Sequence, residues 1–140
     1  MSNLFQRKSD AYWAEGEACV EEGCWNSAAH SLYYAVFQAV FGYAEGSGIL
    51  QIYTKPYIDP YDSRERIPSK HDAVRKIVRK WKGEQGFQVL KGLYAARIAA
   101  DYKAEDVTGP QVTPHMRAAD AIRQYFINLK TIPTENLKNE

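Results

Sequence analysis

The stretch "SLYYAVFQAVFGYAEG", from Ser31 to Gly46, decides the fold class of this chain. Apolar side chains recur in it every three to four residues, which is the period of an α-helix. Aromatic and aliphatic side chains also occupy the remaining sides, among them the adjacent tyrosines Tyr33 and Tyr34. A helix that is apolar nearly all round is buried on several sides. We therefore expect this helix to be the centre of a helical bundle, or to lie partly against a second subunit.

Four further helices are predicted from the same periodicity, and no run alternates apolar and polar residues for long enough to predict a strand. Asn26 or Ser27 is a suitable cap for the central helix. Gly83 and Gly86 separate the third helix from the fourth, and Pro114 occupies the first position of the last helix. The expected helices span about residues 4–22, 26–44, 69–82, 87–102 and 114–129.

The chain has 140 residues, the usual size of one domain, so we expect residues 1–140 to form a single helical domain. Residues 47–68 hold three prolines and three tyrosines. We expect them to form a long loop, a kind of connection that is often functional. Pro133 ends the last helix, and about residues 131–140 are expected to be a flexible tail.

Positive charge is concentrated in one short segment, although the formal net charge of the whole chain is only +1. Residues 1–63 carry three Lys or Arg and eight Asp or Glu, whereas residues 64–82 carry eight and two. The small total argues against a protein that is coated all over for nucleic acid. The basic segment is either a solvated helix face or a surface for a second copy of the chain or a phosphate chain.

No part of the sequence has the unbroken apolar run of a membrane span, and no early segment has the features of a signal peptide. We therefore expect a cytoplasmic protein without membrane contact, in which Cys19 and Cys24 stay reduced. These cysteines and His30 fit no standard zinc spacing and lack a fourth ligand. We expect neither a metal ion nor a cofactor, and we interpret His30 as a polar position within the central helix.

The fourth helix carries the clearest candidate site, in "YAARIAADY" from Tyr94 to Tyr102. Arg97 and Asp101 are four residues apart and therefore share one helix face. Because Arg97 falls on the apolar stripe of this helix, we expect its guanidinium to be partly buried and to need an anionic partner. That partner is either Asp101, in a structural ion pair, or the phosphate of a ligand.

His71 lies at the start of the third helix in "PSKHDAV", where an imidazole can cap the helix, join a polar network or titrate near neutral pH. No glycine-rich phosphate loop and no serine nucleophile elbow occurs in the chain. The loop tyrosines Tyr53, Tyr57 and Tyr61 precede the basic segment. Their rings either stack on the bases of a nucleic acid or pack on the surface of the domain.

Three sequence patterns occur together in this chain. The central helix contains A-x-x-x-Y-Y-A-x-F-x-A, the third helix starts with K-H-x-x-V, and the fourth ends with R-x-x-A-D-Y. In this order and spacing they resemble the HEPN superfamily of small α-helical proteins, over about residues 5–130. The matching residues are Ala29, Tyr33, Tyr34, Ala35, Phe37, Ala39, Lys70, His71, Val74, Arg97, Ala100, Asp101 and Tyr102.

The resemblance implies an all-α fold, an up-and-down four-helix bundle with an additional fifth helix, usually as a homodimer. It also implies prokaryotic origin and often a minimal nucleotidyltransferase as partner, and many such pairs act as toxin and antitoxin. Catalytic members are metal-independent ribonucleases, in which an arginine and a histidine separated by four to six residues act on an RNA phosphodiester. The resemblance makes Arg97 and His71 candidate catalytic residues, and Arg97, Asp101, Tyr102, Tyr33 and Tyr34 candidate binding residues.

The sequence departs from the ribonuclease pattern, because Asp101 and Tyr102 stand where the histidine is sought. Arg66 and His71 have the spacing of the motif, but they flank the start of the third helix, and we interpret this string as coincidental. Three functions remain open. We expect first a dimer that binds RNA or a nucleotide, for which the resemblance suggests the toxin-like role in a toxin-antitoxin pair. In it Arg97 holds phosphate, Asp101 orients it, and Tyr102 and His71 complete the polar cluster. The alternatives are a non-catalytic module that docks a nucleotidyltransferase-type partner, and a ribonuclease that uses His71.

Overall fold

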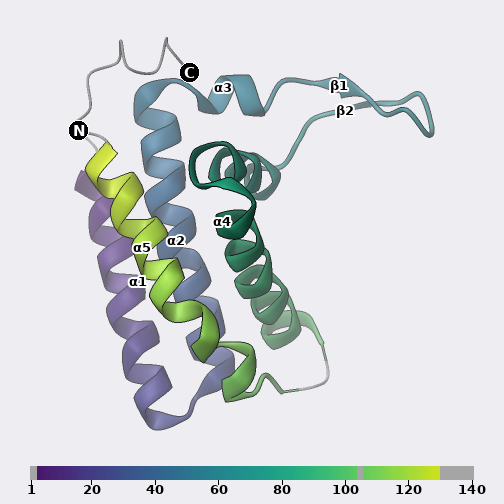
Figure 1. Ribbon diagram of the computed structural model, residues 1–140. Coiled ribbons are helices and arrows are strands. Elements are labelled where there is room, and N and C mark those ends of the chain that lie inside the picture. The colour runs from purple at the N-terminus through teal and green to yellow at the C-terminus, as the bar shows by residue number, and fades with distance from the viewer. Residues whose placement is uncertain (1–2, 104–105, 130–140) are drawn as a thin grey trace.

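Helix α2 (Trp25–Ser47) lies at the centre of the molecule (Figure 1). It packs against α1 (Asn3–Glu22), α4 (Lys70–Tyr102) and α5 (Thr113–Leu129). The helix that was expected to be central from its sequence is therefore central in the fold.

The structure is a computed structural model that describes residues 3–103 and 106–129. Helices make up most of these residues, and the two strands found among them have two residues each. The expected all-α helical bundle is therefore confirmed. None of the helices in the described part of the chain is both long and apolar enough to cross a membrane. The tail expected at about residues 131–140 lies outside the described residues.

Helix α2 is buried on nearly all sides, as its sequence predicts. The side chain of Tyr33, near its middle, has no exposed surface. This degree of burial requires neighbours on several faces, which α1, α4 and α5 supply. The buried residues of α2 are Ala28, Ala29, Ser31, Leu32, Tyr33, Ala35, Val36, Phe37, Ala39, Val40, Phe41, Gly42, Tyr43 and Ala44.

Two glycines allow α1 and α2 to approach each other closely. A Cβ atom added at Gly16 would lie 2.5 Å from Cδ2 of Leu32, and one added at Gly42 would lie 2.5 Å from Cβ of Phe5. Carbon atoms cannot approach so closely, so a larger residue at either position would force the helices apart. The small residues therefore set the distance between α1 and the central helix.

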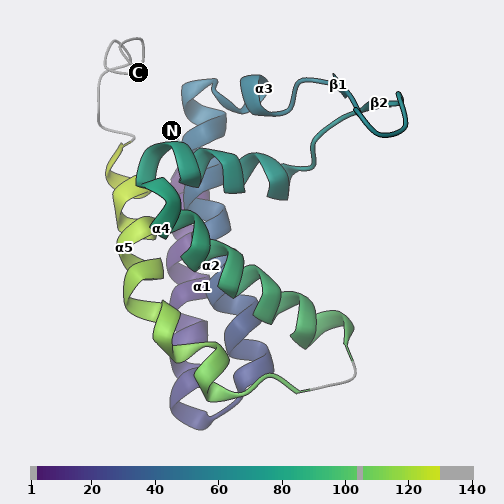
Figure 2. The same ribbon diagram turned by 45° about the vertical axis from the view of Figure 1, so that its right-hand side comes forward.

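Helix α4 consists of two helical segments that join at Gly83, where φ is 77° and ψ is −174°. The two segments run in different directions (Figure 2). They correspond to the helices expected at about 69–82 and 87–102, and the expected break at Gly83 is confirmed. Gly86 lies within the second segment and does not interrupt it. The kink separates the basic segment from Arg97, which lies on the second segment.

Side chains cap the N-terminus of α4 but not that of α2. Ser69 caps α4 through a reciprocal pair of hydrogen bonds with Asp72. The cap position of α2 is Cys24, which makes no side-chain capping bond. The expectation that Asn26 or Ser27 caps this helix is therefore wrong.

Asn26 makes a tertiary contact instead of a cap. Its Nδ2 donates a hydrogen bond to Oδ1 of Asp106 at 3.2 Å, and its Oδ1 accepts one from the backbone N–H of Val107 at 2.8 Å. These bonds hold the segment that follows α4 against the start of α2. A short 3₁₀ helix, η1 (Gly109–Gln111), then leads into α5.

Helix α5 buries the apolar stripe that its spacing predicts, which consists of Ala119, Ile122, Phe126 and Leu129. It also buries Arg123, of which only 5% is exposed. A charged side chain within this stripe was not expected, because the hydrophobic pattern carries no signal for a buried ion pair.

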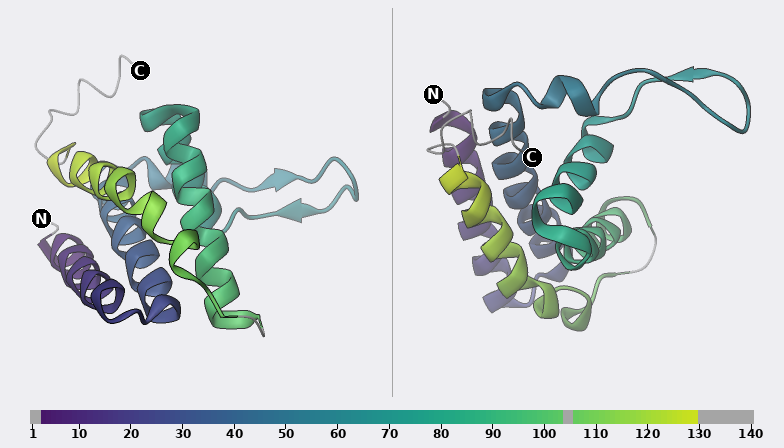
Figure 3. Two further views of the ribbon diagram at one scale, coloured as in Figure 1. Left: turned by 60° about the horizontal axis from the view of Figure 1, so that its bottom comes forward. Right: turned by 45° about the horizontal axis from the view of Figure 1, so that its top comes forward.

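The expected loop at residues 47–68 contains a short helix and a protruding hairpin. Helix α3 (Leu50–Tyr53) is followed by strands β1 (Tyr57–Ile58) and β2 (Glu65–Arg66), which pair antiparallel. The hairpin projects away from the helices in all views (Figures 1–3), and we call residues 54–69 the arm. Strands of two residues are too short for an alternating pattern to predict them.

Candidate functional site

Arg97 and Asp101, on the second segment of α4, meet Tyr34 and His30 of α2. Nη2 of Arg97 donates a hydrogen bond to the hydroxyl of Tyr34 at 2.7 Å. Nε of Arg97 lies 3.0 Å from Oδ2 of Asp101, and Nδ1 of His30 lies 3.1 Å from the same oxygen. One carboxylate oxygen thus lies between a guanidinium and an imidazole. We call these four residues the Arg97 cluster.

The guanidinium of Arg97 is buried without complete pairing of its donors. Only 9% of the residue is exposed. Its Nε lies at ion-pair distance from Asp101, but the two groups are not aligned for a hydrogen bond, and this buried atom has no other partner among the described residues. A buried charge is costly unless it is paired and hydrogen-bonded. The charge of Arg97 is therefore paired with Asp101, but its Nε donor is left without a hydrogen bond.

Two tyrosine rings lie close to this guanidinium. Cζ of Arg97 is 5.1 Å from the centre of the Tyr34 ring and 5.4 Å from the centre of the Tyr102 ring. Both distances are within the range of cation–π contacts. Tyr102 is 72% exposed, so most of its surface remains open to a ligand or a partner.

His71 and Tyr33 form a second pair beside the Arg97 cluster. The hydroxyl of Tyr33 and Nδ1 of His71 are 2.7 Å apart, and the ring centres of Tyr33 and Tyr34 are 5.3 Å apart. The structure thus brings the sequence-predicted residues to one region. Arg97, Asp101 and Tyr34 are in direct contact, whereas His71 and the fully buried Tyr33 lie next to them.

The protonation states in this region follow from burial and from two arginines. Burial lowers the pKa of His71, the charges of Arg97 and Arg75 lower it further, and Asp72 opposes them. Burial raises the pKa of Tyr34, although the charge of Arg97 acts against the rise. Near neutral pH the imidazole of His71 is therefore neutral and the phenol of Tyr34 keeps its proton. The positive charge of the region comes from the arginines.

His30 opens onto a surface hollow that the sequence did not indicate. Its side chain is 41% exposed, and its ring centre lies 4.9 Å from that of Tyr34. The pairing of His30 with Asp101 joins positions 71 residues apart, so only the fold reveals it. Within the sequence, the four-residue spacing of His30 and Tyr34 indicates only that these two side chains share one face of α2. The hollow has a volume of about 200 Å³ and is lined by Glu15, Asn26, Ser27, His30, Ser31 and Asp101.

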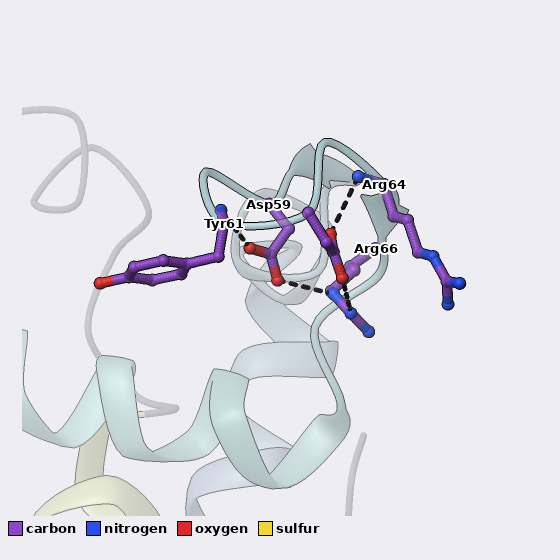
Figure 4. A network of polar contacts seen from close by, with 5 residues as sticks. Asp59, Tyr61, Arg64 and Arg66 are labelled. Atoms are coloured by element: carbon purple, nitrogen blue, oxygen red, sulfur yellow. Dashed lines mark hydrogen bonds and ion pairs between the residues drawn. The ribbon is translucent and has the colours of Figure 1, made fainter.

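Arg66, the first residue of the Arg66-to-His71 string, belongs to the arm. Its Nε lies 2.7 Å from Oδ2 of Asp59, and its Nη2 pairs with Asp62 (Figure 4). The backbone N–H of Tyr61 also donates to Asp59 at 2.8 Å, while its ring points away from this network. The described polar contacts of Arg66 thus hold the tip of the arm in shape and do not involve His71.

Most of the large exposed apolar side chains of the described residues lie on α3 and the arm. Of seven such side chains in the described part of the chain, one lies on α3 and four lie on the arm. Tyr61, at the tip, is 97% exposed. Grouped exposed apolar side chains usually mark an interaction surface. The five residues are Ile52, Tyr57, Ile58, Tyr61 and Ile67.

The two cysteines, Cys19 and Cys24, are free thiols. Across residues 3–103 and 106–129, no group of three or more His, Cys, Asp or Glu side chains is arranged to hold a metal ion. Comparison of the chain with protein-family models, with curated proteins and with solved structures found no match.

Proposed function

We propose that this chain is a HEPN-like homodimer that binds RNA or a nucleotide through a phosphate held at Arg97. The observation that supports this most is the buried guanidinium whose Nε faces Asp101 without a hydrogen bond. A guanidinium offers five N–H donors in a planar fork that matches two oxygens of a phosphate. Arg97 uses one nitrogen for Tyr34 and turns another toward Asp101, which leaves Nη1 for a ligand.

The surroundings of Arg97 suit a nucleotide better than a simple anion. The rings of Tyr34 and Tyr102 lie near the guanidinium, and such rings stack on nucleobases. Asp101 holds the guanidinium in place, and His71 lies next to the cluster. The first segment of α4 adds positive charge that would attract a phosphate chain from solution. Its exposed basic side chains are Lys70, Lys76, Arg79, Lys80 and Lys82.

Binding of a labelled single-stranded RNA to Arg97→Met tests the proposal. This change removes the charge and keeps a side chain of similar length. We expect the affinity to fall at least about tenfold, or about 1.4 kcal/mol, because a charge-assisted contact to phosphate is lost. Arg117→Met is the matched control, since Arg117 is exposed on α5 and its loss should change the affinity less than twofold.

Equal affinities of wild type and Arg97→Met, measured on folded protein at the same salt concentration, would overturn the phosphate assignment. The homodimer is checked separately by sedimentation at micromolar concentration, where we expect a dimer. A monomer there would remove the dimeric part of the proposal.

The exposed apolar side chains of the arm favour a second candidate, a non-catalytic module that docks a protein partner. The arm carries Lys55, Arg64 and Arg66 against Asp59, Asp62 and Glu65, so its own charge is balanced. A neutral apolar surface suits a protein better than a nucleic acid. The resemblance implies that the partner is a minimal nucleotidyltransferase that acts as antitoxin.

Co-expression with the nucleotidyltransferase expected from a neighbouring gene tests the second candidate. Tyr61→Ser combined with Ile58→Ser should abolish co-purification with that partner and leave the helices folded, because both side chains are exposed. Unchanged co-purification would exclude the arm as the docking surface.

The remaining candidate, a ribonuclease that uses His71, has less support from the geometry. Nδ1 of His71 is engaged by the hydroxyl of Tyr33, and the ring packs 4.7 Å from that of Phe37. Burial also lowers its pKa. An imidazole with these contacts is poorly placed to exchange a proton with a bound substrate.

A further inference from the structure

The connection between α1 and α2 brings the two cysteines of the chain together. Gly23, with a φ of 72°, ends α1 in the left-handed conformation. The backbone N–H of Cys24 donates a hydrogen bond to the carbonyl of Cys19 at 2.8 Å, and that of Gly23 donates one to the carbonyl of Val20 at 3.1 Å. These two bonds define a Schellman motif, whose outer bond joins Cys24 to Cys19.

This motif places Cys19 and Cys24 within reach of a disulfide. The covalent geometry on either side of the 2.8 Å bond limits the distance between their Cα atoms to at most about 6.7 Å. A disulfide needs a Cα–Cα distance of about 4.4–6.8 Å. Side chains at these two positions of a Schellman motif also commonly pack against each other, usually as an apolar pair. In this chain both of them are thiols.

The two thiols differ in access and in ionisation. Cys24 is exposed, whereas Cys19 is partly buried. Burial raises the pKa of Cys19, and the negative charges of Cys24, Glu15 and Glu22 raise it further. Cys19 therefore stays protonated near neutral pH. Cys24 is the thiol that a dissolved oxidant meets first, and Cys19 is the neighbouring thiol that completes the reaction.

We propose that Cys19 and Cys24 form a reversible thiol–disulfide pair, which low-molecular-weight disulfides oxidise and low-molecular-weight thiols reduce. The structure holds the reduced form, with two free thiols. Because the chain has only these two cysteines, an internal disulfide has a single possible pairing. The inference does not depend on the ligand that Arg97 binds.

The oxidation is a thiol–disulfide exchange in two steps. The thiolate of Cys24 attacks one sulfur of the small disulfide, forms a mixed disulfide with it, and releases the other half as a thiolate. Cys19 then loses its proton to water, and its sulfur attacks Sγ of Cys24. The bond between Cys19 and Cys24 forms, and the second small thiolate leaves. The protein loses two hydrogen atoms, and one small disulfide becomes two small thiols.

The disulfide would fasten the end of α1 to the start of α2. Cys24 is the cap position of α2 but makes no side-chain capping bond, so its thiol has no structural task that oxidation would disturb. Two residues further on, Asn26 holds Asp106 and Val107 of the segment that follows α4. Oxidation would thus stiffen the end of the bundle that lies opposite the arm (Figure 1).

Incubation of the full-length chain with oxidised glutathione tests this inference. We expect the intact mass to fall by two hydrogen atoms and both free thiols to disappear, and we expect dithiothreitol to restore them. Closing this short ring should raise Tm by about 5–8 °C. Cys19→Ser is the matched control and should stop at a stable mixed disulfide on Cys24. Cys24→Ser, whose remaining thiol is partly buried, should react at least about tenfold more slowly than the wild type.

Three results would overturn the inference. The first is a wild-type chain that keeps both thiols or stops at the mixed disulfide. The second is a disulfide-linked dimer through Cys24 in place of the internal bond. The third is an internal disulfide that lowers Tm, because the folded connection would then have to distort before the two sulfur atoms could pair.

Discussion

Arg97 and Arg123 are both buried arginines, with 9% and 5% of their surfaces exposed, yet their surroundings differ. Arg123 is hydrogen-bonded to two carboxylates, through Nη1 to Asp10 at 2.6 Å and through Nε to Asp120 at 3.0 Å. Its guanidinium also lies 5.2 Å from the centre of the Trp13 ring. Arg123 thereby fastens α5 to α1.

Arg97 has a less complete set of partners. It faces one carboxylate, that of Asp101, and shares it with His30. Among the described residues, its side chain donates one hydrogen bond, to the neutral hydroxyl of Tyr34. Burial of an arginine therefore does not by itself indicate a binding site. Arg97 differs from Arg123 because its Nε has no hydrogen bond and because the partly exposed imidazole of His30 shares its carboxylate.

The largest expected effect on stability is that of Arg123→Met. Loss of two charge-assisted hydrogen bonds, one to Asp10 on α1 and one to Asp120 within α5, should lower the free energy of unfolding by about 2–3 kcal/mol. The loss should not be larger, because Asp10 and Asp120 are 54% and 41% exposed and can be solvated once the arginine is gone. Urea unfolding measures the change. A loss of less than about 0.5 kcal/mol would remove the structural role that we assign to Arg123.

Arg97→Met should have a smaller effect on the same urea curve, of about 1 kcal/mol. Its ion pair with Asp101 lies within one helix, with the base before the acid, which contributes only a few tenths of a kcal/mol. Its bond to Tyr34 adds about 1 kcal/mol, and methionine fills much of the space. If Arg97→Met destabilised the fold as much as Arg123→Met does, the contrast between the two arginines would fail.

The smallest expected effect is a change in the pH dependence of stability. Burial and the charges of Arg97 and Arg75 lower the pKa of His71 in the folded state, whereas Asp72 opposes them. The unfolded chain then binds a proton more readily than the folded chain below about pH 6.5. Stability should therefore fall as the pH decreases from 7 to 5, by a few degrees in Tm. His71→Gln, which can still bond to Tyr33, should flatten this fall.

His30→Gln is the control for the pH measurement. The ring of His30 is partly exposed and faces the carboxylate of Asp101 rather than two guanidinium groups, so its removal should leave the acid-side loss of stability in place. Loss of the pH dependence in His30→Gln, but not in His71→Gln, would show that His71 does not cause the fall in stability below pH 7.

Local patterns predicted most of the helical fold. The recurrence of apolar residues located the four long helices, and Gly83 located the kink of α4. The cap of α2 was predicted wrongly, because Asn26 reaches across to Asp106 and Val107, and such a tertiary bond leaves no trace in the local sequence. The hairpin was not predicted, since its strands are too short to show a period.

The candidate site was predictable only where its contacts are local. The pairing of Arg97 with Asp101 follows from their four-residue spacing on one helix. The contacts of Asp101 with His30 and of Tyr33 with His71 join different helices, and helix packing decides them. A sequence can therefore indicate which residues carry chemistry without indicating which imidazole meets which carboxylate.

The break in α4 depends on backbone handedness rather than on side-chain size. A Cβ atom at Gly83 would meet nothing within 4 Å, so space does not restrict this position. Its positive φ does, because L-amino acids are strained there and their mirror images are not. Chemical synthesis with D-alanine at position 83 should thus preserve the bend, whereas ordinary L-alanine should oppose it.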